Sequence, residues 1–178
     1  MNLPNSLTVL RILLIPVFIG LLTYGQYQWA IWTLLAAGVT DILDGAIARM
    51  ANQRTTLGAY LDPLADKLFL TSAFVTLSVL HLVPGWVAIV VVSRDLIIVA
   101  GTLLLHVTQT PIEVAPTALG KGTTLAQVAY LVLALTLIAL QEDVRQLTPL
   151  LVLMVTLTIA SGLHYVSRGV RAYHANVG

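Results

Sequence analysis

Long apolar segments alternate with short polar connections along the whole chain. A helix needs roughly 20 apolar residues to cross about 30 Å of hydrocarbon. Six segments approach or exceed this length: Leu7–Tyr24, Trp29–Met50, Leu57–Leu80, Gly85–His106, Ala118–Leu140 and Leu147–Val166. Their apolar runs are continuous rather than alternating with period two, which favours helices over β-strands. The pattern predicts an all-α fold, an integral membrane bundle of six transmembrane helices.

The composition agrees with a membrane protein. Hydrophobic residues make up 58% of the 178 residues and charged residues only 10%, whereas about a quarter of the residues in soluble domains are charged. A net charge of +1 gives no support for a nucleic-acid partner. The chain has no cysteine, which excludes disulfides, thiolate zinc ligands and cysteine nucleophiles. Because no internal repeat or linker is visible, we expect residues 1–178 to form a single domain.

Basic residues are unevenly distributed between the two ends of the predicted bundle. The termini and the connections at 51–56 and 108–117 share one end, which has Arg49, Arg54, Lys121, Arg168 and Arg171. The other end has only Arg145, beside Glu142 and Asp143. Because Lys and Arg are in excess on the cytoplasmic side of membrane proteins, we expect both termini to be cytoplasmic, in a bacterial-type plasma (inner) membrane.

Four aspartates interrupt the second and third apolar segments. Asp41 and Asp44 share a face at i, i+3, and Asp62 and Asp66 share one at i, i+4. The short connection makes the two helices antiparallel neighbours, so facing carboxylates would repel each other unless a cation were present. Hard divalent ions prefer oxygen ligands, so the pattern predicts Mg²⁺ or Mn²⁺. Helix capping or ion pairing is the alternative, but capping explains single aspartates rather than this set.

Small residues and one arginine accompany these aspartates. Gly45 and Ala48 continue the face of Asp41 and Asp44, and Gly58 lies one turn before Asp62. Small side chains would leave room for a phosphate-bearing substrate, and the planar guanidinium of Arg49 suits phosphate oxygens. Two metal ions can clamp an in-line displacement at phosphorus, so phosphoryl-group transfer is the expected chemistry. Close helix packing is the alternative for the glycines, and topological anchoring is the alternative for Arg49.

The full spacing resembles that of a known family. The pattern reads Asp41-xx-Asp44-Gly45-xx-Ala48-Arg49, eight residues, then Gly58-xxx-Asp62-xxx-Asp66. Without departure in spacing, it is similar to the signature of the CDP-alcohol phosphatidyltransferase family, and the six-span plan extends the likeness over nearly the whole chain. The resemblance implies that Asp41, Asp44 and Asp62 coordinate two divalent ions. It also implies that Asp66 binds one ion and acts as the general base for the acceptor hydroxyl.

The same resemblance implies a CDP-linked lipid donor and release of CMP. Gly45 and Arg49 would contact the nucleotide portion. Asn5 and Thr8 lie in an amino-terminal segment that resembles the phosphatidylglycerophosphate-synthase branch, where this segment lies against the nucleotide. Thr55 occupies a family position for a small hydroxyl residue and is a further possible donor contact.

Charged residues in the fourth segment are candidates for acceptor binding. An unpaired guanidinium there would be costly, so Arg94 requires either pairing with Asp95 or a polar cavity. Arg94, together with Lys121 and Arg168, could hold an anionic acceptor, although control of topology is the alternative for all three. Lys67, next to Asp66, has no assigned role, since it could pair with a carboxylate or extend towards headgroups.

The resemblance favours one reaction among several. The expected activity is transfer of a phosphatidyl group from CDP-diacylglycerol to the hydroxyl of glycerol 3-phosphate at the cytoplasmic leaflet. The alternatives are a cardiolipin synthase that uses phosphatidylglycerol and, from another class, a cation transporter. Intramembrane carboxylates also occur in transporters, but the sequence lacks their repeat symmetry. The family further implies a homodimer, which apolar faces on the third and fourth segments would permit.

Overall fold

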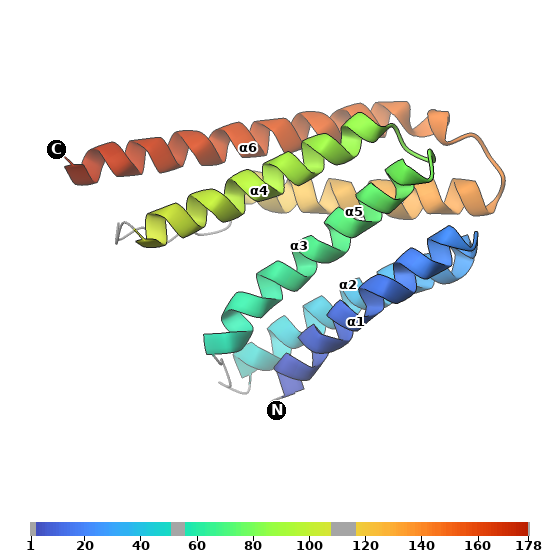
Figure 1. The fold of residues 1–178 in the computed structure, drawn as a ribbon, viewed down its shortest axis with the longest axis horizontal. Coiled ribbons are helices and arrows are strands. Elements are labelled where there is room, and N and C mark those ends of the chain that lie inside the picture. Colours follow the sequence, from blue (N-terminus) through green and yellow to red (C-terminus); the bar gives the residue numbers. More distant parts are fainter. Residues whose placement is uncertain (1–2, 51–55, 108–116, 178) are drawn as a thin grey trace.

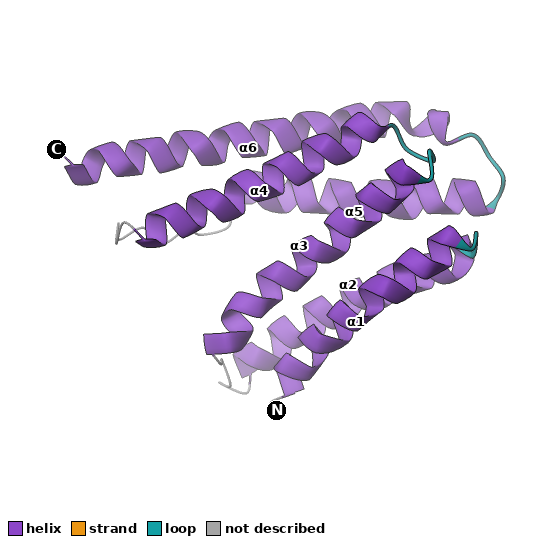
Figure 2. Ribbon diagram, viewed as in Figure 1, coloured by secondary structure: helices purple, strands orange, loops and turns teal. Residues whose placement is uncertain are grey.

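A computed structural model describes the backbone of residues 3–50, 56–107 and 117–177, and the side chains of residues 9–40, 67–101 and 117–171. This part of the chain forms helices joined by short connections (Figures 1 and 2). The α-helices are α1 (Leu3–Thr23), α2 (Tyr27–Met50), α3 (Thr56–Val79), α4 (Gly85–Val107), α5 (Ala118–Ala139) and α6 (Thr148–Val177), with a 3₁₀ turn, η1 (Val144–Leu147), before α6. The predicted all-α fold is confirmed for the described residues, which include no strand.

The predicted helix boundaries agree with the structure to within about one turn, except at the end of α6. That helix continues to Val177, well beyond the predicted limit at Val166. The residues after Val166 are more polar but include no proline, so nothing in them interrupts helical hydrogen bonding. Hydropathy locates the end of the apolar part of a segment, and a helix can continue into water beyond that point. The predicted limit therefore marked the end of the apolar part and not the end of the helix.

The three described connections between helices lie together at one end of the bundle (Figure 1). In each, one residue has a positive φ: Gly25 at 70°, His81 at 56° and Gln141 at 60°. The first helix is closed by a hydrogen bond of 2.8 Å from the Gln26 N–H to the Leu21 carbonyl, and the same six-to-one bond recurs at the other two turns. This is a common helix C-terminal motif, in which glycine avoids the steric cost of a left-handed backbone.

The helices pack as two connected groups. α1 packs against α2 and α3, and α6 packs against α4 and α5; contacts of α3 with α4, and of α2 with α5, join the groups. Aromatic pairs mark two of the buried interfaces: the ring centroids of Phe18 and Phe69 are 5.1 Å apart, and those of Phe74 and Tyr130 are 6.3 Å apart. α3 is therefore in contact with both groups, and residues that it contributes can connect them.

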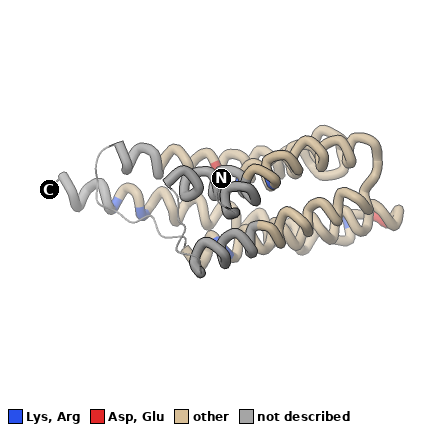
Figure 3. Tube along the Cα trace, turned by 90° about the horizontal axis from the view of Figure 1, so that it is seen from below, with Lys and Arg blue, Asp and Glu red and all other residues tan. Residues whose placement is uncertain are grey.

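The outer surface is rich in apolar side chains, and charged residues are sparse along the described helices (Figure 3). Leu13, Ile89, Leu125 and Leu163 are 59%, 67%, 71% and 67% exposed. Within the residues described, two segments have the length and apolarity to cross a membrane, Ala118–Ala139 and Val144–Arg171, each with a mean hydropathy of 1.8. The described part of the chain thus forms six α-helices, and two of them qualify as membrane spans.

Candidate functional site

The motif aspartates belong to α2 and α3. Asp41 and Asp44 lie in the second half of α2, and Asp62 and Asp66 in the first half of α3, and the two helices run in opposite directions (Figure 1). Their side chains lie outside the described residues, as do those of Asn5, Thr8, Gly45, Ala48, Arg49, Thr55 and Gly58. Where side chains are described, no group of three or more His, Asp or Glu could hold a metal ion. The metal and donor assignments therefore remain predictions.

A buried arginine lies at about the level of one of these aspartates. Arg11 on α1 is 1% exposed, and the ring of Phe18, seven residues later, packs at a tilt of 44° against that of Phe69 on α3. α1 and α3 run in the same direction (Figure 1), and seven residues are about two helical turns. Asp62 lies seven residues before Phe69, so the backbones of Arg11 and Asp62 are at the same level. The helix packed against α3 thus contributes a buried positive charge at this depth.

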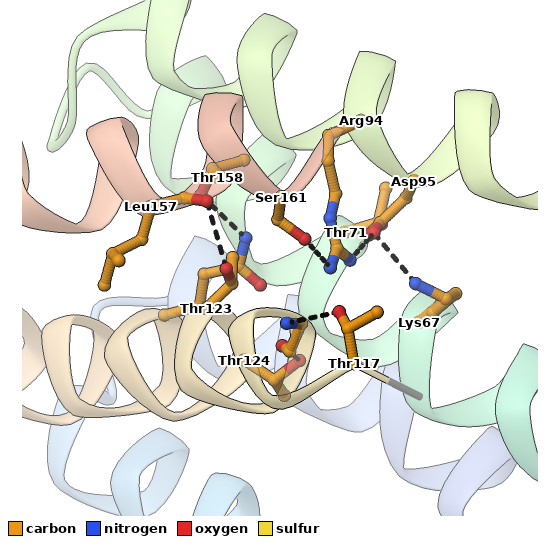
Figure 4. A network of polar contacts seen from close by, with 12 residues as sticks. Lys67, Thr71, Arg94, Asp95, Thr117, Thr123, Thr124, Leu157, Thr158 and Ser161 are labelled. Atoms are coloured by element: carbon orange, nitrogen blue, oxygen red, sulfur yellow. Dashed lines mark hydrogen bonds and ion pairs between the residues drawn. The ribbon is translucent and has the colours of Figure 1, made fainter. Parts of the chain in front are cut away.

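A second polar group, fully described, connects α3 to α4 (Figure 4). The Asp95 carboxylate accepts at one oxygen, Oδ1, from both Lys67 Nζ at 3.0 Å and Arg94 NH1 at 2.8 Å. The side chains of Arg94 and Asp95 are 7% and 11% exposed, and that of Lys67 is 28% exposed. Of the two alternatives for Arg94, pairing with Asp95 is therefore the one that the structure shows. Lys67 pairs with the same carboxylate, which decides between the two alternatives for this residue.

Two hydroxyl groups extend this polar group. Arg94 NH2 donates to Ser161 Oγ on α6 at 2.9 Å, and Thr71 Oγ1 donates to Asp95 Oδ2 at 3.3 Å. The arginine side chain also passes close to a glycine: a Cβ atom on Gly162 would lie 3.5 Å from Arg94 Cγ. Arg94 is therefore held at both terminal nitrogens, by α4's own aspartate and by a serine from α6.

The polar group retains positive charge and one unused donor. Lys67, Arg94 and Asp95 sum to one net positive charge if all three are ionised. Arg94 Nε is buried and has no hydrogen-bond partner among the described residues. Burying a charge or a polar donor without a partner is costly. An anion that accepted from this guanidinium would lower that cost.

The other two predicted acceptor residues lie near Arg94 in the fold, and among the described residues no hydrogen bond joins them to it. Lys121 and Arg168 are exposed, and within the described part of the chain neither forms an ion pair. Lys121 follows Gly120, where a Cβ atom would lie 3.6 Å from Arg94 NH2. Arg168 lies about two turns after Ser161 on α6, and therefore on a similar face. The three basic residues therefore lie in one region of the fold. That their side chains bind one anionic acceptor together stays a prediction.

Some members of this polar group could not be identified from the sequence. Asp95 and Lys67 were visible as ionisable residues in apolar segments, but their pairing joins two helices and has no local signal. Ser161 and Thr71 had no signal at all, because single hydroxyl residues are common in apolar helices and usually bond to their own backbone.

Comparison with known proteins identifies the family. The model of the family described as CDP-alcohol phosphatidyltransferase matches residues 1–162. The chain belongs to this family. It is accordingly a phosphatidyltransferase, with a CDP-alcohol donor and an alcohol acceptor, and this assignment places the motif aspartates in an enzyme.

Three relatives show how far the likeness extends. A protein named probable phosphatidylglycerophosphate synthase from Mycobacterium tuberculosis is 32% identical over 179 residues, covering 96% of this chain and 82% of that protein. The CDP-diacylglycerol–glycerol-3-phosphate 3-phosphatidyltransferase of Bacillus subtilis is 37% identical over 142 residues, covering 71% and 72%. The human cardiolipin synthase (CMP-forming) is 41% identical over 100 residues, covering 56% of this chain and 33% of that protein.

Proposed function

We propose that this protein transfers the phosphatidyl group of CDP-diacylglycerol to the hydroxyl of glycerol 3-phosphate and releases CMP. The supporting observation is the uninterrupted family motif on α2 and α3 in a chain that the family model matches over residues 1–162. Glycerol 3-phosphate is preferred as acceptor because a relative named for phosphatidylglycerophosphate synthesis aligns with 96% of the chain. Membership of an enzyme family also favours a transferase over the cation transporter.

The donor set suits two divalent cations. Asp41, Asp44, Asp62 and Asp66 offer only carboxylate oxygens, the ligands that Mg²⁺ and Mn²⁺ prefer. When bound, such ions stabilise the attacking and leaving oxygens of an in-line displacement at phosphorus. The guanidinium of Arg11 at this level would offset at most one of four negative charges. Following what the family resemblance implies, we assign the first three aspartates as metal ligands, and Asp66 as both a ligand and the general base.

The reaction then follows from the roles of these residues. Asp66 takes the proton of the acceptor hydroxyl, whose oxygen forms a bond to the lipid-side phosphorus of the donor. The bond between that phosphorus and the bridging oxygen breaks, and CMP leaves with the electron pair. Gly45, Ala48 and Gly58 provide clearance for the phosphates, Arg49 binds their oxygens, and Asn5, Thr8 and Thr55 surround the nucleotide.

The acceptor phosphate would bind at the basic region of α4, α5 and α6. Arg94 supports this role, because it is held by neighbours at two nitrogens while its buried Nε–H lacks a partner among the described residues. Lys121 and Arg168, which are exposed nearby, would complete the site. The net positive charge of the Lys67, Arg94 and Asp95 group complements a phosphate monoester, which carries nearly two negative charges at neutral pH.

We further propose that all six helices of residues 1–178 form one membrane domain in a bacterial-type inner membrane, with the active site and both termini in the cytoplasm. Trp29, Trp32 and Trp86 are 64%, 66% and 50% exposed near the end of the bundle that has the described turns (Figure 1), as expected for an aromatic belt at the outer interface. The exposed apolar faces of α3 and α4, including Val79 and Leu96, are proposed to meet in a homodimer.

Release of CMP by the purified protein tests the proposal. With CDP-diacylglycerol and Mg²⁺, we expect CMP when glycerol 3-phosphate is added, loss of the reaction with a chelator, and recovery on adding the metal back. Phosphatidylglycerol as acceptor tests the second candidate, which the likeness to the human cardiolipin synthase favours. Absence of CMP with glycerol 3-phosphate contradicts the proposed reaction. Formation of CMP only with phosphatidylglycerol would favour the cardiolipin synthase reaction in its place.

A further inference from the structure

We propose that Asp95 is a positioning residue, which sets Arg94 for the acceptor phosphate by tying it to the helix that carries Asp66. This inference rests on the proposed function. We call Lys67, Arg94 and Asp95 the clamp. Lys67 follows Asp66 directly on α3, and Arg94 and Asp95 lie on α4. A single oxygen, Asp95 Oδ1, receives both cations, so this one side chain connects the proposed base helix to the proposed phosphate-binding arginine.

The hydrogen bonds of Arg94 determine where its guanidinium lies. Arg94 NH1 is held at 2.8 Å by Asp95 and Arg94 NH2 at 2.9 Å by Ser161. Two contacts at different nitrogens determine the plane of the guanidinium, because its donors have a fixed fork geometry. Without Asp95, only the contact with Ser161 would remain, and the side chain could rotate about it.

The clamp also constrains the spacing between α3 and α4. Lys67 Nζ reaches the Asp95 carboxylate across the α3–α4 interface at 3.0 Å, and Thr71, one turn further along α3, reaches its other oxygen at 3.3 Å. Reacting groups must be placed to within about an ångström for efficient transfer. A contact between these helices, one residue from Asp66, is suited to hold the acceptor phosphate at a fixed distance from the base.

A purely electrostatic role for Asp95 predicts the opposite kinetic effect. Asp95→Asn would raise the net charge of the clamp by one unit, so a dianionic acceptor would bind more tightly if Asp95 only moderated charge. If Asp95 positions Arg94, the same change weakens acceptor binding in spite of the added positive charge. The sign of the change in KM for glycerol 3-phosphate therefore separates the two roles.

The experiment uses the full chain in detergent micelles or vesicles, and measures CMP release while each substrate is varied in turn. For Asp95→Asn we expect KM for glycerol 3-phosphate to rise about tenfold, the effect of losing one charge-assisted hydrogen bond, and kcat to fall. KM for CDP-diacylglycerol should stay within about twofold, since Asp95 lies on α4, which carries none of the proposed donor residues. Thr76→Val is the matched control, because Thr76 lies on the same helix as Lys67 and its hydroxyl donates to the Ser72 carbonyl of that helix at 2.7 Å, and it should leave KM for glycerol 3-phosphate nearly unchanged.

A double variant separates charge from geometry. Lys67→Met with Asp95→Asn restores the net charge of the clamp to one while removing the ion pair that joins α3 to α4. We expect this variant to remain impaired towards glycerol 3-phosphate; recovery to wild-type KM would overturn the proposal. Asp95→Glu conserves the charge and moves the carboxylate by one methylene. We expect its KM for glycerol 3-phosphate to lie between those of the wild type and Asp95→Asn. This variant replaces Asp95→Asn in the experiment if the latter does not fold.

The outcomes distinguish this inference from the proposed function. A wild-type protein that releases no CMP with glycerol 3-phosphate contradicts the proposed reaction. An active wild-type protein whose Asp95→Asn variant has an unchanged or lower KM for glycerol 3-phosphate contradicts the positioning role alone. Equal increases in KM for both substrates would also overturn it, because they would indicate a general loss of structure.

Discussion

Gln127 on α5 donates a hydrogen bond to the hydroxyl of Thr158 on α6, with 3.3 Å between Nε2 and Oγ1. Both residues are buried, at 2% and 0% exposure. One turn earlier on α5, the Thr123 hydroxyl shares its proton between the Leu119 carbonyl of its own helix at 2.8 Å and the Leu157 carbonyl of α6 at 3.1 Å. Apolar surfaces give little preference for one helix register over another in lipid, whereas polar contacts of this kind do. These bonds set the register of the two helices that qualify as membrane spans.

A double-mutant cycle on this pair measures its contribution. We expect Gln127→Leu and Thr158→Val to show a coupling of about 0.6 kcal/mol, and at most about 1.7 kcal/mol, the range found for hydrogen bonds between membrane helices. The measurement is the free energy of unfolding in micelles for the two single variants and the double variant. Additivity within about 0.3 kcal/mol would show that the bond contributes nothing to stability.

Replacing Gly25 by alanine should destabilise the fold by about 1 kcal/mol, because an alanine at a φ of 70° is strained. Gly38, in the middle of α2, is the matched control. A methyl group added to Gly38 would meet open space, and Gly38→Ala should be neutral or stabilising by up to about 1 kcal/mol, since alanine favours helix. Thermal unfolding of the two variants checks this, and an equal shift in Tm would contradict the role assigned to the turn.

Asp66→Asn should reduce kcat by about 10²- to 10⁴-fold, the usual contribution of a general base, with the folded protein retained. Asp143→Asn is the control. Asp143 lies in the connection before η1, where its side chain accepts from the Arg145 N–H at 2.9 Å, and asparagine can cap equally well. The measurement is the rate of CMP release at saturating substrate concentrations. An Asp66→Asn enzyme with more than about a tenth of wild-type activity would show that Asp66 is not the general base.

Arg168→Gln should raise KM for glycerol 3-phosphate by about tenfold, as expected when one charge-assisted hydrogen bond to phosphate is lost. KM for CDP-diacylglycerol should change by less than about twofold. Arg171, also exposed on α6, supplies the comparison, because Arg171→Gln removes the same charge almost one turn further from Ser161. If both variants behave alike, the effect is one of overall charge, and Arg168 has no specific role in acceptor binding.

The sequence predicted the helices because their apolar residues form long continuous runs separated by short polar connections. About 20 apolar residues make one crossing, and each expected segment became an α-helix. The predicted end of α6 was wrong, because the helix continues beyond its apolar part. Among the described residues two segments qualify as membrane spans, so the prediction of six crossings stays a prediction. The pairing of Arg94 with Asp95 was also within reach, since a buried guanidinium needs a counter-charge and the next residue supplies one.

The sequence could not predict the contacts between distant helices. Nothing in the spacing of Lys67 and Asp95 indicates that α3 and α4 place them 3.0 Å apart, because such pairing depends on how two helices rotate and slide against each other. Ser161 is similarly hidden, since its role follows from where α6 crosses α4. The motif aspartates could be singled out from the sequence, because the prediction for them depends on residue type and helical spacing, both of which are local. Their predicted role in metal binding stays a prediction, since their side chains lie outside the described residues.

The length of α6 has a consequence for the dissolved substrate. Thirty residues at about 1.5 Å each span about 45 Å, against about 30 Å of hydrocarbon, so in the proposed membrane placement about three turns of this helix would extend beyond the bilayer core. Arg168 and Arg171, both exposed, would lie on the part outside the core. Two guanidinium groups in the aqueous layer beside the headgroups would attract small anions before these reach the buried interior. Binding of a charged soluble acceptor should therefore weaken as ionic strength rises. Binding of the lipid donor should change less, because that substrate would arrive by lateral diffusion in the membrane.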